Sequence, residues 1–205
     1  LLGPNGSGNT TSMHCLTTLV EPTAGSAWIA GHPIRSAGVA IRRDIGVVFQ
    51  SPALDPSLTV EETLAFAGAI RGLPRRVSRQ RAEAMLELFR LDASRRARVG
   101  TLSGGTRRAV DIARSVIHRP RILFLDEPTA GLDPTARRFT LDLIAQLAET
   151  RTVIVATHIL SDIDQICDHV GVVHEGRMIF SGPMREMKQR LQRDDFTLEV
   201  EGTPE

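Results

Sequence analysis

The sequence predicts an α/β fold in which a mostly helical segment is inserted between the strands of one core. Strand-like apolar stretches near the start and in the second half alternate with helical patterns, an order that is typical of a sheet covered by helices. Two glycine-rich segments, residues 3–8 and 103–105, each precede a helical pattern. An acidic pair, Asp126-Glu127, ends an apolar strand. Open α/β sheets bind ligands at the carboxyl ends of their strands, so the pair indicates a candidate site.

The first 118 residues pass from strands to helices. Apolar and β-branched residues give the strand segments their composition, and the first glycine-rich loop opens the first helix. A capping box, with Thr59 as the cap and Glu62 three positions later, opens the first helix of the insert. In chain order we expect a strand stub at 1–2, a helix at 10–19, strands at 26–30 and 45–49, and helices at 59–72, 78–91 and 103–118.

After residue 118 strands again alternate with helices. The stretch 122–125 is apolar throughout, as a buried strand requires, and Glu175-Gly176 marks a turn between two strands. We expect strands at 122–125, 152–156, 168–174, 177–181 and 197–200, and helices at 134–149 and 183–193. The expected organisation is one domain, with a core at 1–50 and 119–182, a helical subdomain at 51–118, and a C-terminal helix and the start of a further strand at 183–205.

Composition and charge argue against a nucleic-acid-binding, membrane-spanning or cysteine-metal protein. The 205 residues carry a net charge of +1, so no strong field attracts nucleic acid or an anionic membrane. No apolar run approaches the roughly 18–20 residues of a membrane span, and we expect a soluble, cytoplasmic chain. Cys15 and Cys167 lack the spacing of a metal site, which indicates two reduced thiols. Because the chain starts at Leu1, directly before a loop that a strand must feed, we expect the early strands to be missing.

The first glycine-rich segment has the spacing of a phosphate-binding loop. Four residues separate Gly3 from Gly8, and glycines let backbone N–H groups approach phosphate oxygens closely. The helix that follows adds the positive end of its dipole, and Thr10 is placed to offer its hydroxyl to magnesium. Asn9 stands where this motif normally has a lysine, and its amide has no charge to neutralise phosphate. The chain has 24 arginines and a single lysine, Lys188, so no lysine lies near the loop in sequence.

Polar residues follow three of the expected strands. Asp126 fits a magnesium ligand, and Glu127 fits a general base that polarises the attacking water. Gln50 has the reach to touch metal or water, and His158 is placed to contact a γ-phosphate. The alternatives are a helix-capping acid pair and ordinary polar loop residues. The phosphate loop upstream favours the catalytic interpretation of all four.

A second anion site is predicted where the helix at 103–118 begins. Ser103-Gly104-Gly105 opens this helix, so free backbone N–H groups and the helix dipole are directed at a ligand. The chain already has one phosphate loop. The second site therefore indicates that it serves the nucleotide of another subunit.

Together these motifs resemble the ATP-binding subunit of ABC transporters over essentially the full chain. The matching segments are the loop at 3–11, Gln50, Leu102-Ser103-Gly104-Gly105, strand 122–126 with Glu127, Gly131-Leu132-Asp133 and His158. The resemblance implies a P-loop NTPase core with an inserted helical subdomain, and ATP and Mg²⁺ as ligands. It assigns catalysis to Glu127, His158 and Gln50, and the metal to Thr10, Gln50 and Asp126. It assigns nucleotide binding to Gly3, Pro4, Asn5, Gly6, Ser7, Gly8, Asn9, Thr10, Thr11, Ser103, Gly104, Gly105 and Asp133.

The resemblance also implies partners and a location. In this family two such subunits enclose two ATP molecules head to tail, as a homodimer or heterodimer, and separate transmembrane permease subunits are bound at the inner face of the membrane. Nucleic acid is not an implied partner. Segments such as Val48-Phe49-Gln50 and Leu132-Asp133-Pro134 are most similar to the drug-export or ABC-2 type branch, which includes daunorubicin-resistance ATPases.

Several features leave alternatives open. Asn9 replaces the family lysine, Thr106 stands where Met or Gln is usual, and the chain has no tyrosine to stack on adenine. The chain can therefore be a degenerate, non-hydrolysing partner that supplies only its signature motif, or a soluble ABC ATPase not tied to transport. The arginine-rich segment 71–98 fits a solvated helical face, and the alternative is a docking surface for the membrane subunit.

Overall fold

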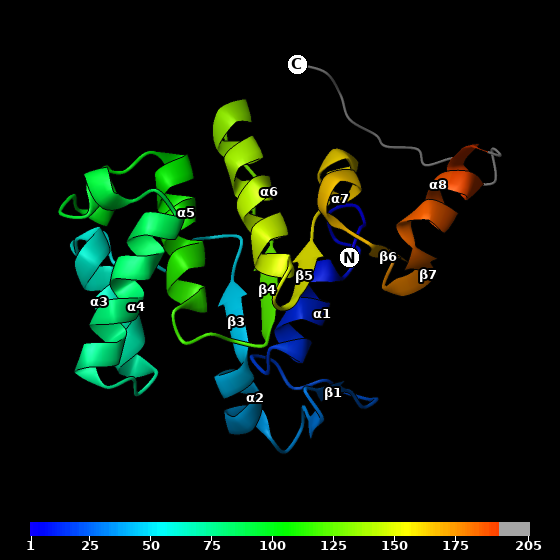
Figure 1. Cartoon of the computed structure of the whole chain (residues 1–205). Coiled ribbons are helices and arrows are strands. Elements are labelled where there is room, and N and C mark those ends of the chain that lie inside the picture. The colour runs from blue at the N-terminus through cyan, green and yellow to red at the C-terminus, as the bar shows by residue number, and fades with distance from the viewer. Residues whose placement is uncertain (193–205) are drawn as a thin grey trace.

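The structure, a computed structural model that describes residues 1–192, is a parallel sheet with helices on both faces (Figure 1). Within this part of the chain no helix has the length and apolar character needed to cross a membrane. The strands are β1 (Trp28–Ile29), β2 (His32–Pro33), β3 (Ile45–Val48), β4 (Ile122–Asp126), β5 (Thr152–Ala156), β6 (His169–His174) and β7 (Arg177–Pro183). The helices are α1 (Asn9–Leu16), α2 (Gly38–Asp44), α3 (Val60–Ile70), α4 (Arg75–Leu88), α5 (Gly104–Val116), α6 (Pro134–Ala148), α7 (Leu160–Ile166) and α8 (Met184–Gln192), with short 3₁₀ turns at Asp92–Ser94 and Val99–Thr101.

The central sheet has the order β3-β4-β5, and all three strands are parallel. Leu2 forms parallel bridges to Thr157 and to Val172, so the expected strand stub lies between the end of β5 and strand β6. Strands β6 and β7 pair as an antiparallel hairpin. Glu175 and Gly176 form its turn with φ values of 46° and 74°, the backbone of a tight hairpin turn. The α/β fold with a helical insert is confirmed.

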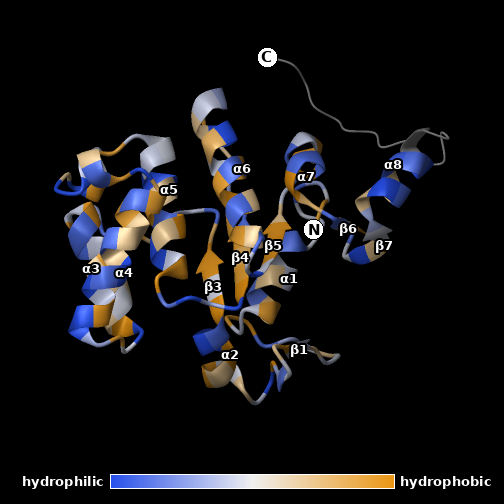
Figure 2. Ribbon diagram, in the orientation of Figure 1, coloured by the Kyte–Doolittle hydropathy of each residue, from blue (hydrophilic) through white to orange (hydrophobic). Residues whose placement is uncertain are grey.

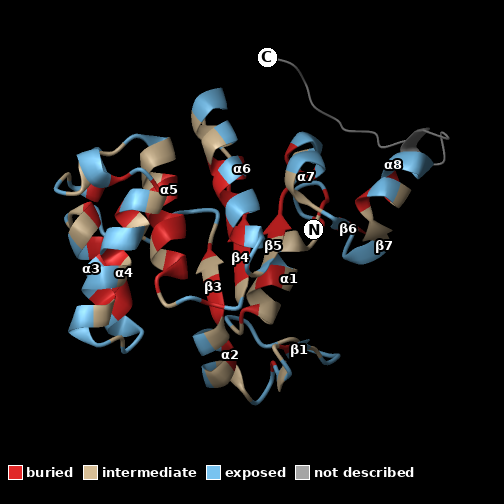
Figure 3. Cartoon of the chain, viewed as in Figure 1, coloured by how far each residue is buried: buried red, intermediate tan, exposed pale blue. Residues whose placement is uncertain are grey.

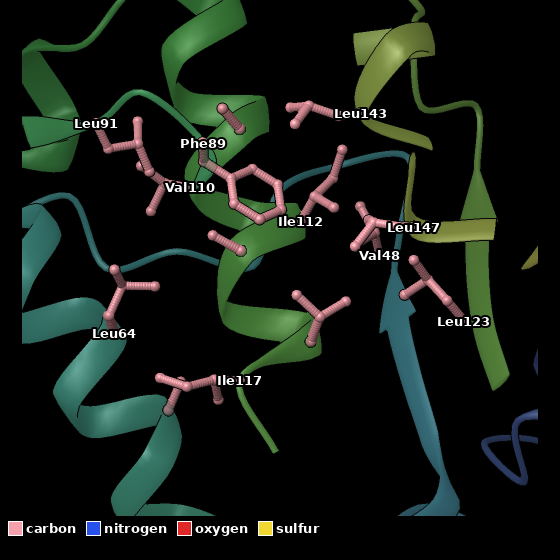
Figure 4. Packing of buried hydrophobic residues seen from close by; sticks show 14 of the residues in the cluster. Val48, Leu64, Phe89, Leu91, Val110, Ile112, Ile117, Leu123, Leu143 and Leu147 are labelled. Atoms are coloured by element: carbon pink, nitrogen blue, oxygen red, sulfur yellow. The ribbon is translucent and has the colours of Figure 1, made fainter. Parts of the chain in front are cut away.

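Strand β4 is buried on both faces, which explains why it is apolar throughout. Successive side chains of a strand point to opposite faces of the sheet. Leu123 and Leu125 pack into the large apolar cluster with α5 and α6, whereas Phe124 packs on the other face with Met13 of α1 and Ile41 of α2. Strand β4, most of β3, the carboxyl end of β5 and the inner side of α5 are accordingly buried, and the three strands are largely apolar (Figures 2 and 3). Figure 4 shows the large cluster, in which side chains of α5 meet those of β3 and α6.

Helix α3 starts where its sequence predicts. The Thr59 hydroxyl accepts a hydrogen bond from Glu62 N at 3.2 Å, and the Glu62 carboxylate accepts one from Thr59 N at 2.8 Å. Both halves of the capping box are therefore formed. A cap of this kind stabilises a helix by roughly 1 kcal/mol, and it therefore fixes the residue at which α3 begins.

Several expected boundaries differ from the structure for local reasons. The helix expected at 10–19 ends at Leu16, because the Thr17 hydroxyl bonds back to Met13 O at 2.8 Å and Thr18 adopts a positive φ of 61°. The strand expected at 26–30 shortens to Trp28–Ile29, since the next residues turn sharply into β2. Helices α2 and α7, of seven residues each, were not predicted. The strand expected at 197–200 lies outside the described residues.

His118, just beyond α5, is a partly buried histidine with a strongly shifted pKa. Its Nε2 lies 2.9 Å from Ile45 O, while Nδ1 is buried without a partner in the described residues. Burial, together with the nearby cations Arg71 and Arg81, lowers the pKa of His118 from 6.5 to about 4. Between these two pH values the unfolded chain binds a proton here and the folded chain does not. The contribution of neutral His118 to the free energy of unfolding is therefore fully present above about pH 6.5 and is lost as the pH falls toward about 4.

We therefore expect acid to destabilise the fold through His118. The free energy of unfolding should fall by about 1 kcal/mol from this residue between pH 7 and pH 5, a figure discounted because the ring is partly exposed. His118→Gln retains a donor for Ile45 O but cannot titrate, so urea unfolding at the two pH values should show a smaller difference. The same substitution at exposed His174 is the control. Equal pH slopes for all three proteins would contradict this explanation.

Candidate functional site

The loop over residues 3–8 leads from the central sheet into α1 and requires glycine at three positions. A Cβ at Gly3 would lie 2.2 Å from Val173 O, so a larger residue would displace β6. Gly6 and Gly8 have φ values of 82° and 105°, which favour glycine. No side chain caps α1, and its first backbone N–H groups therefore remain available to an anion.

Polar atoms inside this loop lack partners in the described residues. Ser7 is buried and its Oγ makes no hydrogen bond, and the same holds for Asn9 Oδ1. Asn9 Nδ2 reaches across the loop and donates to Gly3 O at 3.4 Å. Because an unpaired buried polar atom costs free energy, such atoms indicate a loop that is completed by a ligand. The Ser7 hydroxyl can donate to a phosphate oxygen, and the Asn9 oxygen can accept from water.

Asp126, at the end of β4, lies beside the start of α1. It is 3% exposed, and its carboxylate lies beside the Thr10 hydroxyl. Burial raises the pKa of Asp126, the neighbouring Thr10 hydroxyl opposes this shift, and the charge of Glu127 adds to it. A cation bound here would stabilise the ionised carboxylate. Residues 1–192 contain no cluster of three or more His, Cys, Asp or Glu side chains suited to a metal. The Thr10–Asp126 pair instead fits Mg²⁺, which is commonly held by one or two carboxylates together with phosphate oxygens.

Glu127 is held by the residues that follow β5. Its Oε2 accepts a hydrogen bond from the Thr157 hydroxyl at 3.2 Å. Its Oε1 accepts one from His158 N at 3.1 Å and lies 2.8 Å from His158 Nδ1. Glu127 also has a φ of 46°, an uncommon backbone for a residue with a side chain, and its own N–H donates to Ala156 O at 2.8 Å. Strained backbone of this kind is common at functional sites. The structure thus brings Glu127 and His158 together, a contact that the sequence analysis does not predict.

Gln50 is placed differently from the acidic pair. It is exposed directly after β3, and its side chain makes no hydrogen bond to the described residues. Strand β3 is the neighbour of β4, so Gln50 follows the same edge of the sheet as Asp126. Its backbone carbonyl, by contrast, is bound by Arg108.

Ser103, Gly104 and Gly105 lie apart from the chain's own glycine-rich loop. In the view of Figure 1, α6 lies between the start of α5 and the loop that opens α1. The Ser103 hydroxyl caps α5 by accepting from Thr106 N at 3.2 Å. A Cβ at Gly105 would lie 2.5 Å from the Cβ of Ala136 on α6, so close helix packing alone requires glycine here. Asp133 caps α6, with its Oδ1 accepting from the N–H groups of Thr135 and Ala136.

Two buried networks around the site are not predicted by the sequence. Arg108 of α5 is 4% exposed and donates to the backbone oxygens of Gln50 and Glu127. Asp162 of α7 is 2% exposed and binds Arg137 of α6 and the hydroxyl of Thr129. A signal for Arg108 does exist in the sequence. It lies four residues before buried Ile112 and thus on the apolar face of α5, where an arginine is unexpected.

The fold places a glycine-rich loop, followed by a helix, beside the carboxyl ends of parallel strands. This arrangement defines a P-loop nucleotide-binding domain. A family model described as "ABC transporter" matches residues 1–130. The chain therefore belongs to the ABC transporter family of ATP-binding proteins. The predicted P-loop NTPase core with a helical insert agrees with the solved structures that the chain resembles.

The relatives include proteins named for drug resistance. The chain is 41% identical over 191 residues to the doxorubicin resistance ATP-binding protein DrrA of Mycobacterium tuberculosis, covering 93% of this chain and 58% of the relative. It is 38% identical over 200 residues to the uncharacterized ABC transporter ATP-binding protein YxlF of Bacillus subtilis, covering 98% and 66%. Its fold matches that of cbiO1 from Clostridium perfringens, part of the ABC transporter complex cbiONQ, with a TM-score of 0.83 at 31% identity over 94% and 79% of the two chains. The resemblance to the drug-export branch is confirmed, and the chain spans 58% to 66% of the length of these two curated relatives.

Proposed function

We propose that the chain is the ATP-binding and ATP-hydrolysing subunit of an ABC-type exporter. One observation carries the proposal: the glycine-rich loop, the Thr10–Asp126 pair and the Glu127–His158 pair meet at the carboxyl edge of one parallel sheet. Membership of the family supports ATP as the nucleotide. The relative named for doxorubicin resistance supports export as the process. We regard the chain as a single ATPase domain, with residues 51–118 as its helical subdomain.

Each site residue has a distinct role in this proposal. The loop from Gly3 to Thr11 binds the phosphates through backbone N–H groups. Thr10, Asp126 and Gln50 hold Mg²⁺, which neutralises phosphate charge when bound. Glu127 accepts the proton of the attacking water, because its carboxylate is oriented from both sides by Thr157 and His158. His158, whose side chain is 46% exposed, is free to turn toward the γ-phosphate.

The signature residues serve a second subunit in this proposal. Ser103, Gly104 and Asp133 are exposed, and in the view of Figure 1 α6 lies between the start of α5 and the loop that opens α1. A free helix N-terminus that has no phosphate loop of its own chain beside it can complete the site of a partner. We therefore infer a head-to-tail dimer, of identical or different chains, with two nucleotides between its subunits.

A second candidate function rests on Asn9. A chain without the loop lysine can act as a partner that contributes its signature residues while another subunit performs hydrolysis. A heterodimer would then keep one competent site, and a homodimer of this chain would have none. Turnover by the purified chain alone distinguishes this role from that of a self-sufficient ATPase.

The helical subdomain offers a surface for the separate transmembrane subunit. A cavity of about 680 Å³ opens between α3 and α4, and Phe66 and Ile70 of α3 are 58% and 63% exposed. These two side chains lie one helical turn apart and form an apolar pair. Exposed apolar residues beside a cavity are typical of interaction sites. Arg75 and Arg79 line the same cavity, so part of the arginine-rich segment 71–98 lies beside the proposed contact with the transmembrane subunit.

The transport assignment is tested by co-purification with the transmembrane subunit. Phe66→Glu places a charge in the apolar contact and should reduce recovery of the complex at least tenfold, since a loss of about 1.4 kcal/mol or more already has this effect. Arg76→Glu, an exposed change on α4 outside the cavity, is the control. Equal recovery of both variants and the natural chain would contradict this docking surface.

A further inference from the structure

Arg108 is a buried arginine that the proposed mechanism does not use. It lies on α5, five residues after Ser103, and is 4% exposed. Its Nη1 donates to Phe49 O at 2.9 Å, and its Nη2 donates to Gln50 O at 3.0 Å and to Glu127 O at 3.3 Å. One guanidinium thus holds the two residues after β3 and the residue after β4 to the helix that starts at the signature motif.

The surroundings of Arg108 show that its charge is retained against a cost. Burial lowers the pKa of Arg108, and the neighbouring carboxylate of Asp111, 3.7 Å away, opposes this shift. Asp111 is itself fully buried and is paired with Arg114. Ile112, one turn further along the same face, is apolar and buried, so packing alone would favour an apolar residue here. The planar fork of arginine is what allows one side chain to bind three carbonyls at once.

The bound carbonyls belong to the segments that carry the proposed catalysis. Glu127 has the uncommon φ of 46°, which persists only where surrounding contacts hold it. Its carbonyl accepts from Arg108 and from Ala130 N at 3.3 Å, and its N–H donates to Ala156 O. Gln50 has no side-chain hydrogen bond in the described residues, so its carbonyl contact with Arg108 is the one that holds it.

We propose that Arg108 is a positioning residue that fixes the backbone of Gln50 and Glu127 to helix α5. This inference rests on the proposed function, because α5 also begins at Ser103, the end proposed to contact a partner's nucleotide. Helix α5 then joins two functions. At its start Ser103 contacts the nucleotide of the partner, and just over one turn later Arg108 holds Glu127, the base that acts on the chain's own nucleotide. Closure of the dimer onto Ser103 is thereby transmitted to Glu127 of the same chain.

The first test is amide hydrogen exchange, which does not depend on turnover. Arg108→Lys keeps the charge and most of the length but not the fork. We expect the hydrogen-bonded amides of Glu127 and Ala130 to exchange about tenfold faster or more, while those in 112–116 of α5 are unchanged. The control is Arg81→Lys, because Arg81 also donates to a backbone carbonyl, that of Ile117, away from these segments. No change, or a uniform rise that includes 112–116, would overturn the inference.

The second test is kinetic and uses the Asn9→Lys chain as the parent. Misplacement of a catalytic group by about 1 Å can cost about a hundredfold in rate. We expect Arg108→Lys to lower kcat roughly tenfold to a hundredfold with KM for ATP within about threefold, and Arg81→Lys to change neither. An unchanged kcat, or a rise in KM without a fall in kcat, would refute the positioning role. Absence of turnover in the parent would refute the proposed function instead, and the exchange result would still decide the role of Arg108.

Discussion

Asn9→Lys is expected to tighten Mg-ATP binding by about five- to thirtyfold. A charge-assisted hydrogen bond contributes about 1.5–3 kcal/mol, whereas a neutral one contributes about 0.5–1.5 kcal/mol. The difference of roughly one to two kcal/mol corresponds to that change in affinity. Turnover should rise by at least as much, because charge on the phosphates is stabilised more in the transition state than in the ground state. Calorimetric titration and steady-state turnover measure the two effects.

Neither Asn9 nor the chain's one lysine supplies this charge in the structure. The Asn9 amide is occupied across the loop by Gly3 O, and its oxygen faces the loop interior without a partner in the described residues. The chain's one lysine, Lys188, is on α8, where it pairs with Asp164. Asn9→Gln is the matched control, because it lengthens the side chain without adding charge. A gain with glutamine equal to that with lysine would show that reach, and not charge, limits the natural site.

Glu127→Gln is expected to have the largest effect on hydrolysis. In the Asn9→Lys chain it should lower turnover by about 10²–10⁴-fold, the usual contribution of a general base. Glutamine keeps the shape. Its single carbonyl oxygen can still accept from His158 N, and its NH₂ group can donate to the Thr157 hydroxyl oxygen, so the local structure should persist. Binding of Mg-ATP should be retained, and the proposed dimer should accumulate because its nucleotides are not consumed. Size-exclusion chromatography with and without Mg-ATP measures this accumulation.

The control for this change is Glu149→Gln, which removes an exposed carboxylate at the end of α6. It should leave both turnover and association unchanged. Turnover of the Glu127→Gln variant at the parental rate would show that Glu127 is not the base. Loss of Mg-ATP binding in that variant would show instead that its carboxylate is needed for the nucleotide site itself.

Local chemistry made much of this fold predictable. The Gly-x₄-Gly loop requires a particular backbone, and a capping box starts α3. Strand β4 is apolar before Asp126 because its side chains are buried. These patterns depend on neighbours in the sequence. Helices α2 and α7 were missed because each has only seven residues, too few for an amphipathic pattern to be distinguished from a loop.

Long-range contacts account for the rest of the site. Arg108 binds carbonyls 58 and 59 residues earlier in the chain, and Asp162 binds Thr129 from 33 residues away. No local pattern encodes such partners. Gly105 is assigned to nucleotide binding from the sequence. The structure shows a different reason for glycine at this position, which is its close packing against Ala136 of α6. The roles of the signature residues and of Gln50 therefore stay predictions.

We propose that the carboxyl edge of the β3-β4-β5 sheet is an ATPase site limited by the missing charge at Asn9. Mg-ATP turnover by the natural chain and by Asn9→Lys, measured under the same conditions, tests this proposal. We predict a low rate for the natural chain and a rate at least about five- to thirtyfold higher for the lysine variant. Equal rates in the two proteins would show that another group supplies the charge and would contradict this account.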